Sequence, residues 1–177
     1  VGSRGLGDVY KRQNVDKLLV CPNGAQHRDY HFTEKPLKPS WTLYLGRIEP
    51  RKRQYLYQDI YGVEFVGKYT DTTSFDRNRD CYLGQWEHEY KLQHVTDYGN
   101  MMLLSDGENG TPLVIKEALV AGLGVVVSKY AAHDLDTSLP FVTVIPDDKW
   151  EDIEYVQKKL IENRKISVTM RKEIRQY

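Results

Sequence analysis

One stretch of the chain, Met101–Ser128, constrains the fold more than any other. It begins with a short apolar run and ends with the β-branched run Val125–Val127, and both fit buried strands of a parallel sheet. Between them, helical spacing predicts a helix with Thr111 as its N-cap and Pro112 as its first residue. A strand, a loop, a helix and a second strand make the repeating unit of an α/β fold.

The start of this helix is a candidate phosphate site. The loop before it, Ser105–Gly110, is rich in glycine, aspartate and asparagine. Free backbone N–H groups and the positive end of the helix dipole point at the same place. The alternative is an ordinary strand–helix–strand unit with nothing bound, since a loop-to-helix turn is a weak motif on its own.

The rest of the chain alternates in the same way. Apolar and aromatic runs predict strands at Lys17–Val20, Trp41–Leu45, Val63–Val66, Cys81–Leu83, Met101–Leu104 and Phe141–Ile145. Helices are predicted at Gln54–Tyr61, Glu87–His94 and Trp150–Leu160, with a second C-terminal helix starting near Ser167. This alternation predicts an α/β domain, a Rossmann-like parallel β-sheet flanked by helices.

The domain organisation follows from composition. Residues 1–13 have scattered glycines, mixed charge and no apolar period, so we interpret them as an adapter or cloning-derived, disordered segment. A native flexible terminus is the alternative. Residues 14–40, with Pro36 and Pro39, are predicted to be an interdomain connection, and residues 41–177 the Rossmann-like domain, truncated at its C-terminus.

Overall composition indicates no particular macromolecular partner. The chain has 177 residues, 40% of them hydrophobic, and a formal net charge of zero, which favours neither nucleic-acid nor membrane binding. No apolar run approaches the roughly 18 residues of a transmembrane segment. Cys21 and Cys81 form no metal or redox spacing, which suits a reducing, cytoplasmic setting. Neither His88 and His94 nor the Asp134-x-Asp136 pair indicates a metal site.

A basic turn follows the predicted strand Trp41–Leu45. It carries four cations between Gly46 and Arg53. Gly46 allows close approach of a ligand, while Arg47 and Lys52 offer a fork and a point charge for phosphate. Ligands of parallel sheets collect where strands end. The alternative is a solvated basic loop.

Four segments in this order resemble the C-terminal, donor-binding domain of GT-B glycosyltransferases, in particular the retaining family 4. They are the turn Cys21–Gly24, the strand and basic turn Tyr44–Lys52, the strand end Tyr82–Gly84, and Leu103–Ser128. The resemblance runs from about Leu18 to the end of the chain. It implies a fragment, the Rossmann-like half of a two-domain enzyme whose N-terminal acceptor domain is missing.

The resemblance also implies residue roles. Arg47 and Lys52 would hold the donor diphosphate and the charge of the leaving group. The backbone at Gly110 and Thr111 would cradle phosphate, and Glu117 would bind the ribose hydroxyls; an exposed helix glutamate is the alternative for Glu117. Two further glycines would line the donor site at strand ends, Gly46 and Gly84.

The sequence departs from the family pattern at two positions. The family places a glutamate eight positions before the one at Glu117, and this position is Asn109, with Glu108 one residue earlier. Either Glu108 or Asn109 could therefore face the donor sugar. Gly124 stands where the family has proline.

The implied activity is retaining, metal-independent hexosyl transfer from a nucleoside-diphosphate sugar, a UDP- or GDP-sugar, without a further cofactor. The acceptor could be a glycan, a lipid or a protein, and the fragment alone is expected to be inactive. The alternatives are another GT-B-type enzyme such as a sugar-nucleotide epimerase, or a non-catalytic nucleotide-binding module. The unusual glutamate spacing favours the last of these.

Overall fold

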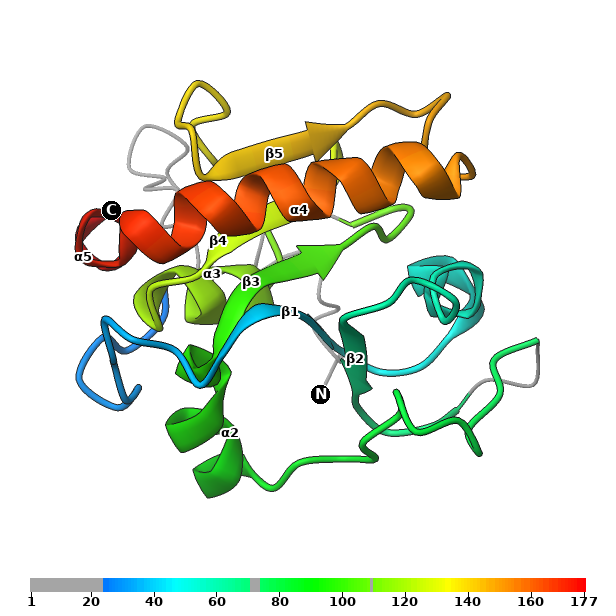
Figure 1. The fold of residues 1–177 in the computed structure, drawn as a ribbon, viewed down its shortest axis with the longest axis horizontal. Helices are drawn as coiled ribbons and strands as arrows, with labels where there is room; N and C mark the ends of the chain where they lie inside the picture. The colour runs from blue at the N-terminus through cyan, green and yellow to red at the C-terminus, as the bar shows by residue number, and fades with distance from the viewer. Residues whose placement is uncertain (1–23, 71–73, 109) are drawn as a thin grey trace, which may run out of the picture.

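The computed structural model describes residues 24–70, 74–108 and 110–177. In this part of the chain, five parallel strands form one sheet in the order β2-β1-β3-β4-β5 (Figure 1). Their bounds are β1 (Lys38–Leu45), β2 (Val63–Val66), β3 (Tyr98–Leu103), β4 (Gly124–Ser128) and β5 (Val142–Ile145). The predicted α/β, Rossmann-like fold is confirmed. The predicted strand Lys17–Val20 lies outside the described residues.

Helices cover both faces of the sheet. The α-helices are α2 (His88–His94), α3 (Leu113–Val120), α4 (Ile153–Thr169) and α5 (Arg171–Gln176). Helix α4 lies across one face and contacts β1, β3, β4 and β5, while α3 packs against β3 and β4 from the opposite face (Figure 1). Three short 3-10 turns complete the description: η2 (Pro50–Lys52), η3 (Gln54–Leu56) and η4 (Val95–Asp97).

The core is centred on β3 and β4. Every residue of these two strands is buried, and the register pairs Met101 with Val125 and Leu103 with Val127. Near-continuous apolar runs are what a parallel strand needs when helices cover both of its faces. The stretch that dominated the sequence analysis is therefore the centre of the fold.

Helix α4 carries a polar stripe into this core. Asn163 is 1% exposed and donates to the carbonyl oxygens of Val125 and Phe141, while Asn100 donates to its Oδ1 at 2.9 Å. The Ser167 hydroxyl, also buried, accepts from the Gly124 N–H at 2.7 Å. The predicted second C-terminal helix is present as α5, but it begins at Arg171 instead of near Ser167, because α4 continues to Thr169 with Ser167 bonded to the sheet.

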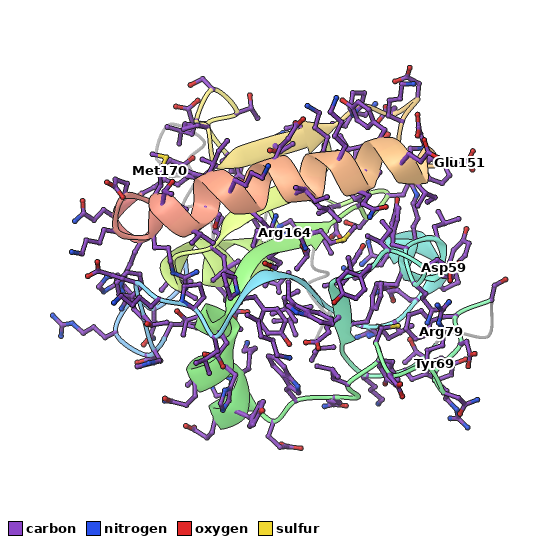
Figure 2. The ribbon with its side chains drawn as sticks, in the orientation of Figure 1. Asp59, Tyr69, Arg79, Glu151, Arg164 and Met170 are labelled. Atoms are coloured by element: carbon purple, nitrogen blue, oxygen red, sulfur yellow. The ribbon has the colours of Figure 1, made fainter. Side chains whose placement is uncertain are left out.

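Two arginines extend the stripe. Arg164, labelled in Figure 2, reaches from α4 to the Thr42 hydroxyl and the Gly62 carbonyl. Arg171, at the start of α5, is 2% exposed and donates to four backbone carbonyls, those of Thr33, Thr96, Tyr98 and Ala121. Burial lowers the pKa of Arg171 to about 10, so the guanidinium stays charged at neutral pH. These contacts fasten the C-terminal helix to the start of β3 and the end of α3.

Other predicted elements differ in detail. Segment Cys81–Leu83 is no full strand, since only Tyr82 bridges to Phe65 of β2. The predicted helix Gln54–Tyr61 is limited to the 3-10 turn η3. The first helical residue of α3 is Leu113, because Pro112 is the N-cap with an extended ψ of 144°. Strand β1 begins at Lys38, before Pro39, where a register shift separates its start from the regular pairing with β3.

Replacing Asn163 tests the polar stripe. Asn163→Leu keeps the branching at Cγ but removes the side-chain hydrogen bonds to the Val125 and Phe141 carbonyls and to the Asn100 amide in the core. We expect a loss of about 3 kcal/mol or more in the free energy of unfolding, measured by urea denaturation. The control Lys165→Ala changes an exposed residue of the same helix and should stay within about 0.5 kcal/mol of the wild type. Equal stability of both variants would contradict a structural role for the stripe.

Candidate functional site

Three glycines stand side by side at the carboxyl ends of the first strands. Gly46 donates to the Val66 carbonyl at 2.9 Å, and Gly67 donates to the Gly84 carbonyl at 2.9 Å. A Cβ on Gly67 would lie 1.9 Å from the Gly46 oxygen, so only glycine fits there. The structure thus brings the predicted site residues Gly46 and Gly84 together through Gly67. Sequence analysis did not single out Gly67, although a glycine directly after a predicted strand was a signal for it.

The basic turn lies over this edge of the sheet. The Lys52 side chain runs across Gly46, with its Cδ 3.5 Å from where a Cβ of Gly46 would be. Its Nζ is 3.0 Å from Oε1 of Glu108, and Nη1 of Arg51 is 3.5 Å from the same oxygen. The predicted residues Lys52 and Glu108, 56 positions apart, therefore meet. Asn109, the alternative to Glu108, lies outside the described residues.

Two backbone connections hold Lys52 in place. The fully buried Tyr44 hydroxyl accepts from the Leu104 N–H at 3.1 Å and donates to the Lys52 carbonyl. The Asp106 N–H donates to the Arg51 carbonyl at 2.9 Å. The turn after β1 is therefore fixed to the chain that leaves β3.

Arg53 gives the basic turn its shape. It has a left-handed backbone, with φ 56°, which is uncommon for a residue with a side chain. Its guanidinium lies 3.9 Å above the ring of Trp150 and 3.4 Å from Asp106. These side-chain contacts offset the backbone strain, and the conformation aims Lys52, the preceding residue, at Glu108.

Each cation of the turn already has a carboxylate partner. Arg47, with 62% of its side chain exposed, is 3.8 Å from Glu49, which also accepts from Arg51 at 2.8 Å. Burial raises the pKa of Glu108, but the lowering effects of its polar and charged neighbours, above all Lys52, together outweigh burial, so this pKa is lowered overall. Four cations and three carboxylates leave one excess positive charge. A phosphate can bind here by exchanging with a carboxylate.

The start of α3 also has a carboxylate partner. The Thr111 N–H donates to Oδ2 of Asp134 at 3.2 Å, and the Asp134 N–H donates to the Thr111 hydroxyl at 3.0 Å. A Cβ on Gly110, whose φ is 91°, would lie 3.4 Å from the same Oδ2. Hydrogen bonds from His133 and Thr111 lower the pKa of Asp134. Asp134 thus accepts from the Thr111 N–H, which was predicted to bind phosphate. Sequence analysis missed this pairing.

Glu117 lies on the face of α3 turned toward α2. It is 8% exposed, and its Oε1 is 2.8 Å from Nζ of Lys91. Burial and the charge of the nearby Glu117 carboxylate raise the pKa of Tyr30. The alternative of an exposed helix glutamate is therefore wrong. A ribose hydroxyl would have to share this carboxylate with Lys91.

In segments 24–70, 74–108 and 110–177, no group of three or more histidine, cysteine, aspartate or glutamate side chains is placed to hold a metal ion. None of the helices in the same segments is long and apolar enough to cross a membrane.

Comparison with known proteins gives matches only at the level of structure. No model of a protein family matches the chain, and no curated protein matches it. The crystal structure of TarM superposes with a TM-score of 0.60 at 16% identity, over 96% of this chain and 37% of that one. AviGT4, a glycosyltransferase involved in avilamycin A biosynthesis, gives 0.60 at 18% identity, over 91% and 56%. Anabaena Alr3699/HepE in complex with UDP-glucose gives 0.56 at 14%, over 77% and 43%.

These similarities establish the fold. At such identities they show architecture alone, and it is an architecture that GT-B glycosyltransferases contain. The chain spans 37–56% of the lengths of these three structures.

The Lys52–Glu108 pair predicts a pH dependence. Because the pKa of Glu108 is lowered in the folded state, the pair stabilises the protein above the unfolded-state pKa of about 4.3 and loses this effect as the pH falls through the folded-state value. In Lys52→Met we expect the Glu108 pKa to rise above that of the wild type, measured by carboxyl-detected NMR titration. The control Lys159→Met, on the outer face of α4, should leave it unchanged. An unshifted Glu108 in Lys52→Met would contradict the ion pair.

Proposed function

We propose that this chain is the donor-binding domain of a retaining GT-B glycosyltransferase of the family 4 type, which takes a UDP- or GDP-sugar. The observation that carries the proposal is the meeting of Lys52 and Glu108 over Gly46, at the carboxyl ends of β1 and β3. Its position matches the resemblance in sequence, and one structural neighbour was solved with UDP-glucose.

In the proposed complex, the donor diphosphate takes the place of Glu108 on Lys52 and Arg51. Charge-assisted hydrogen bonds of these cations, joined by Arg47, would then stabilise the negative charge that develops on the leaving diphosphate. The bond between the anomeric carbon and the diphosphate oxygen breaks with its electron pair on that oxygen. An acceptor hydroxyl bonds to the same carbon on the same face, and its proton passes to the diphosphate.

Glu108 gains a second role once it is displaced. A carboxylate 3.0 Å from the phosphate-binding lysine is near enough to accept hydrogen bonds from hydroxyls of the transferred sugar. Asn109 remains the alternative for this contact. The acceptor, and a second domain to bind it, are part of the proposal and rest on the resemblance to two-domain enzymes.

A second candidate is a nucleotide-binding module without catalysis. The observation in its favour is Asp134, which holds the Thr111 N–H and so competes with phosphate at the start of α3. Binding by itself would be common to both candidates. Sugar transfer by the chain together with an acceptor domain would distinguish the enzyme from the module.

The decisive variant is Lys52→Gln. A charge-assisted contact to phosphate contributes about 1.5–3 kcal/mol, so we expect UDP and GDP binding by the 177-residue chain to weaken roughly tenfold or more, and uridine and guanosine binding to change little. Isothermal titration calorimetry measures all four ligands. Lys165→Gln, on the outer face of α4, is the matched control. Equal losses for nucleosides and nucleotides, or no loss at all, would refute the proposed phosphate contact.

Asp134 permits a test in the opposite direction. If diphosphate uses the Thr111 N–H, then Asp134→Ala removes its competitor and should tighten UDP binding about threefold or more, an effect of roughly 0.7 kcal/mol. Asp136→Ala removes a neighbouring carboxylate that is bonded to Ser138 and not to Thr111, and it should have little effect. Unchanged or weaker UDP binding in Asp134→Ala would place the diphosphate away from the start of α3.

A further inference from the structure

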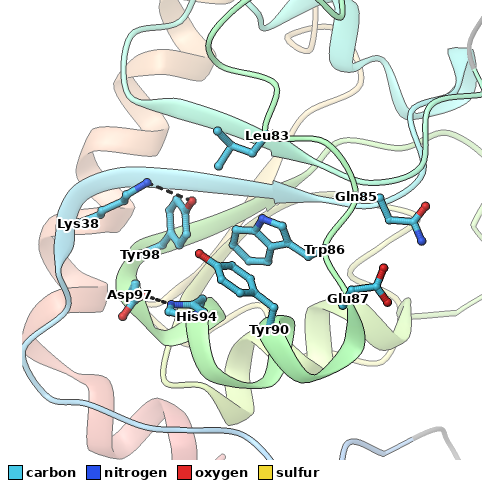
Figure 3. A pocket seen from close by; sticks show the side chains of 9 residues that line it. All are labelled: Lys38, Leu83, Gln85, Trp86, Glu87, Tyr90, His94, Asp97 and Tyr98. Atoms are coloured by element: carbon cyan, nitrogen blue, oxygen red, sulfur yellow. Dashed lines mark hydrogen bonds and ion pairs between the residues drawn. The ribbon is translucent and has the colours of Figure 1, made fainter.

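A groove lined by aromatic side chains lies between α2 and strands β1 and β3. It encloses about 510 Å³, within the usual range for ligand sites. Three aromatic rings form its walls, those of Trp86, Tyr90 and Tyr98 (Figure 3). We call it the aromatic groove. Neither the predicted donor site nor the phosphate-binding residues include these rings.

The rings form an open corner. Trp86 and Tyr90 meet edge to face, with centroids 5.2 Å apart and planes at 66°. His94 stacks on Tyr90 at 3.9 Å and supports it, although 49% of Tyr90 is exposed. Trp86 is backed by the buried Tyr98, 6.2 Å away. A rigid aromatic corner that remains open to solvent can pack against the C–H face of a sugar ring, which is apolar on one side and bears hydroxyls at its edge.

Two charged pairs border the groove, apart from the exposed Glu87 at its rim. Lys38 is 2.6 Å from Glu64, and His94 is 2.8 Å from Asp97 (Figure 3 shows the second pair). The Lys38 ammonium also lies 5.0 Å from the centre of the Tyr98 ring, where an external cation would otherwise bind. These four charged groups are therefore already paired, and none of them offers a free counter-charge to an anion or a quaternary ammonium. A neutral ligand rich in hydroxyls is the better match, with Gln85 and Glu87 at the exposed rim as hydrogen-bonding partners.

A second aromatic hollow continues on the other side of the Lys38–Glu64 pair. Trp41 and Tyr61 line it with ring centroids 5.7 Å apart, and its volume is about 670 Å³. Tyr61 is 81% exposed, and the Lys38 ammonium is 5.8 Å from the Trp41 ring. Aromatic surfaces on both sides of one polar bridge suit successive rings of a chain-like ligand.

We propose that the aromatic groove binds a neutral oligosaccharide, with one sugar ring in the corner of Trp86 and Tyr90 and the chain passing Lys38 toward Trp41 and Tyr61. This site goes beyond the donor-binding function and does not depend on it, because the groove can bind sugar without any nucleotide. In an enzyme that glycosylates polysaccharide, it would hold the glycan away from the reacting end.

A nucleobase is the competing occupant, since the rim residues Leu83 and Gln85 flank Gly84 of the predicted donor site. The far end of the groove argues for a longer ligand. Lys38 is the first residue of β1 and Gly46 follows its last, so eight steps of about 3.3 Å separate these two residues by roughly 25 Å. A base attached to a diphosphate at Lys52 leaves the Lys38 end of the groove unfilled.

The test is calorimetric titration of the 177-residue chain with maltohexaose and cellohexaose, without nucleotide. We expect at least one of them to bind, and Trp86→Ala and Tyr90→Ala each to weaken that binding roughly tenfold, or about 1.4 kcal/mol. Tyr90→Ala alters an exposed side chain and keeps the test valid if Trp86→Ala fails to fold. The matched control Tyr130→Ala removes a tyrosine of similar exposure beyond β4 and should bind as the wild type does.

Other outcomes overturn the proposal. They are no binding of either hexasaccharide, equal binding by wild type and Tyr90→Ala, and displacement of the bound sugar by uridine, which would identify the groove as a nucleobase site. Tetramethylammonium binding that is lost in Tyr90→Ala, with no sugar binding, would instead assign a cation site. Lys52→Gln should leave hexasaccharide binding unchanged, so failure of the donor site and failure of the groove are separate results.

Discussion

The buried amide of Asn163 is the interaction on which the arrangement of the sheet depends. It donates to carbonyls at the start of β4 and just before β5, and it accepts from Asn100 of β3, which in turn accepts from the Thr42 hydroxyl of β1 at 2.6 Å. A buried amide is satisfied only when all these strands are present in one register, and leaving it unsatisfied costs free energy. The network therefore selects one packing of α4 on four strands, where apolar contacts alone would tolerate slippage.

The geometry of the candidate site depends on this strand register. The same register that pairs Thr42 with Asn100 pairs Leu43 with Met101, and so brings the end of β1 beside the end of β3. There the Tyr44 hydroxyl can reach both the Leu104 N–H and the Lys52 carbonyl. The position of Lys52 against Glu108 thus follows from hydrogen bonds made deep in the sheet. A loop anchored in this way can hold charged side chains at fixed separations without support from a ligand.

The sequence was sufficient to locate those elements whose determining signals are local. Apolar runs and the glycines that end them located β2, β3 and β4 to within a few residues, and the resemblance assigned both Lys52 and the glutamate region to one donor site. The C-terminal half of α4 was missed because Asn163 and Ser167 interrupt its apolar period, although their polar atoms are satisfied by partners far away in sequence. The Thr111–Asp134 pairing was missed for the same reason, since no local pattern indicates which of several surface aspartates reaches the start of a helix 23 residues earlier.

The two proposed phosphate-binding elements, the basic turn and the start of α3, are both already paired with carboxylates of the protein itself. Glu108 neutralises Lys52, and Asp134 accepts from the first free N–H before α3. A diphosphate that binds these groups has to replace their contacts to Glu108 and Asp134. The free energy of binding is therefore the difference between the new contacts and the lost ones, and it is smaller than the sum of the new contacts. In the proposed complex, the displaced carboxylates would be hydrogen-bond acceptors beside the bound phosphate; free inorganic phosphate offers them few donors, whereas a sugar offers several hydroxyls. Under the proposed function, self-pairing would therefore weaken binding of the bare anion and shift selectivity toward a ligand that joins diphosphate to sugar, because that ligand satisfies both the cations and the acids that it separates.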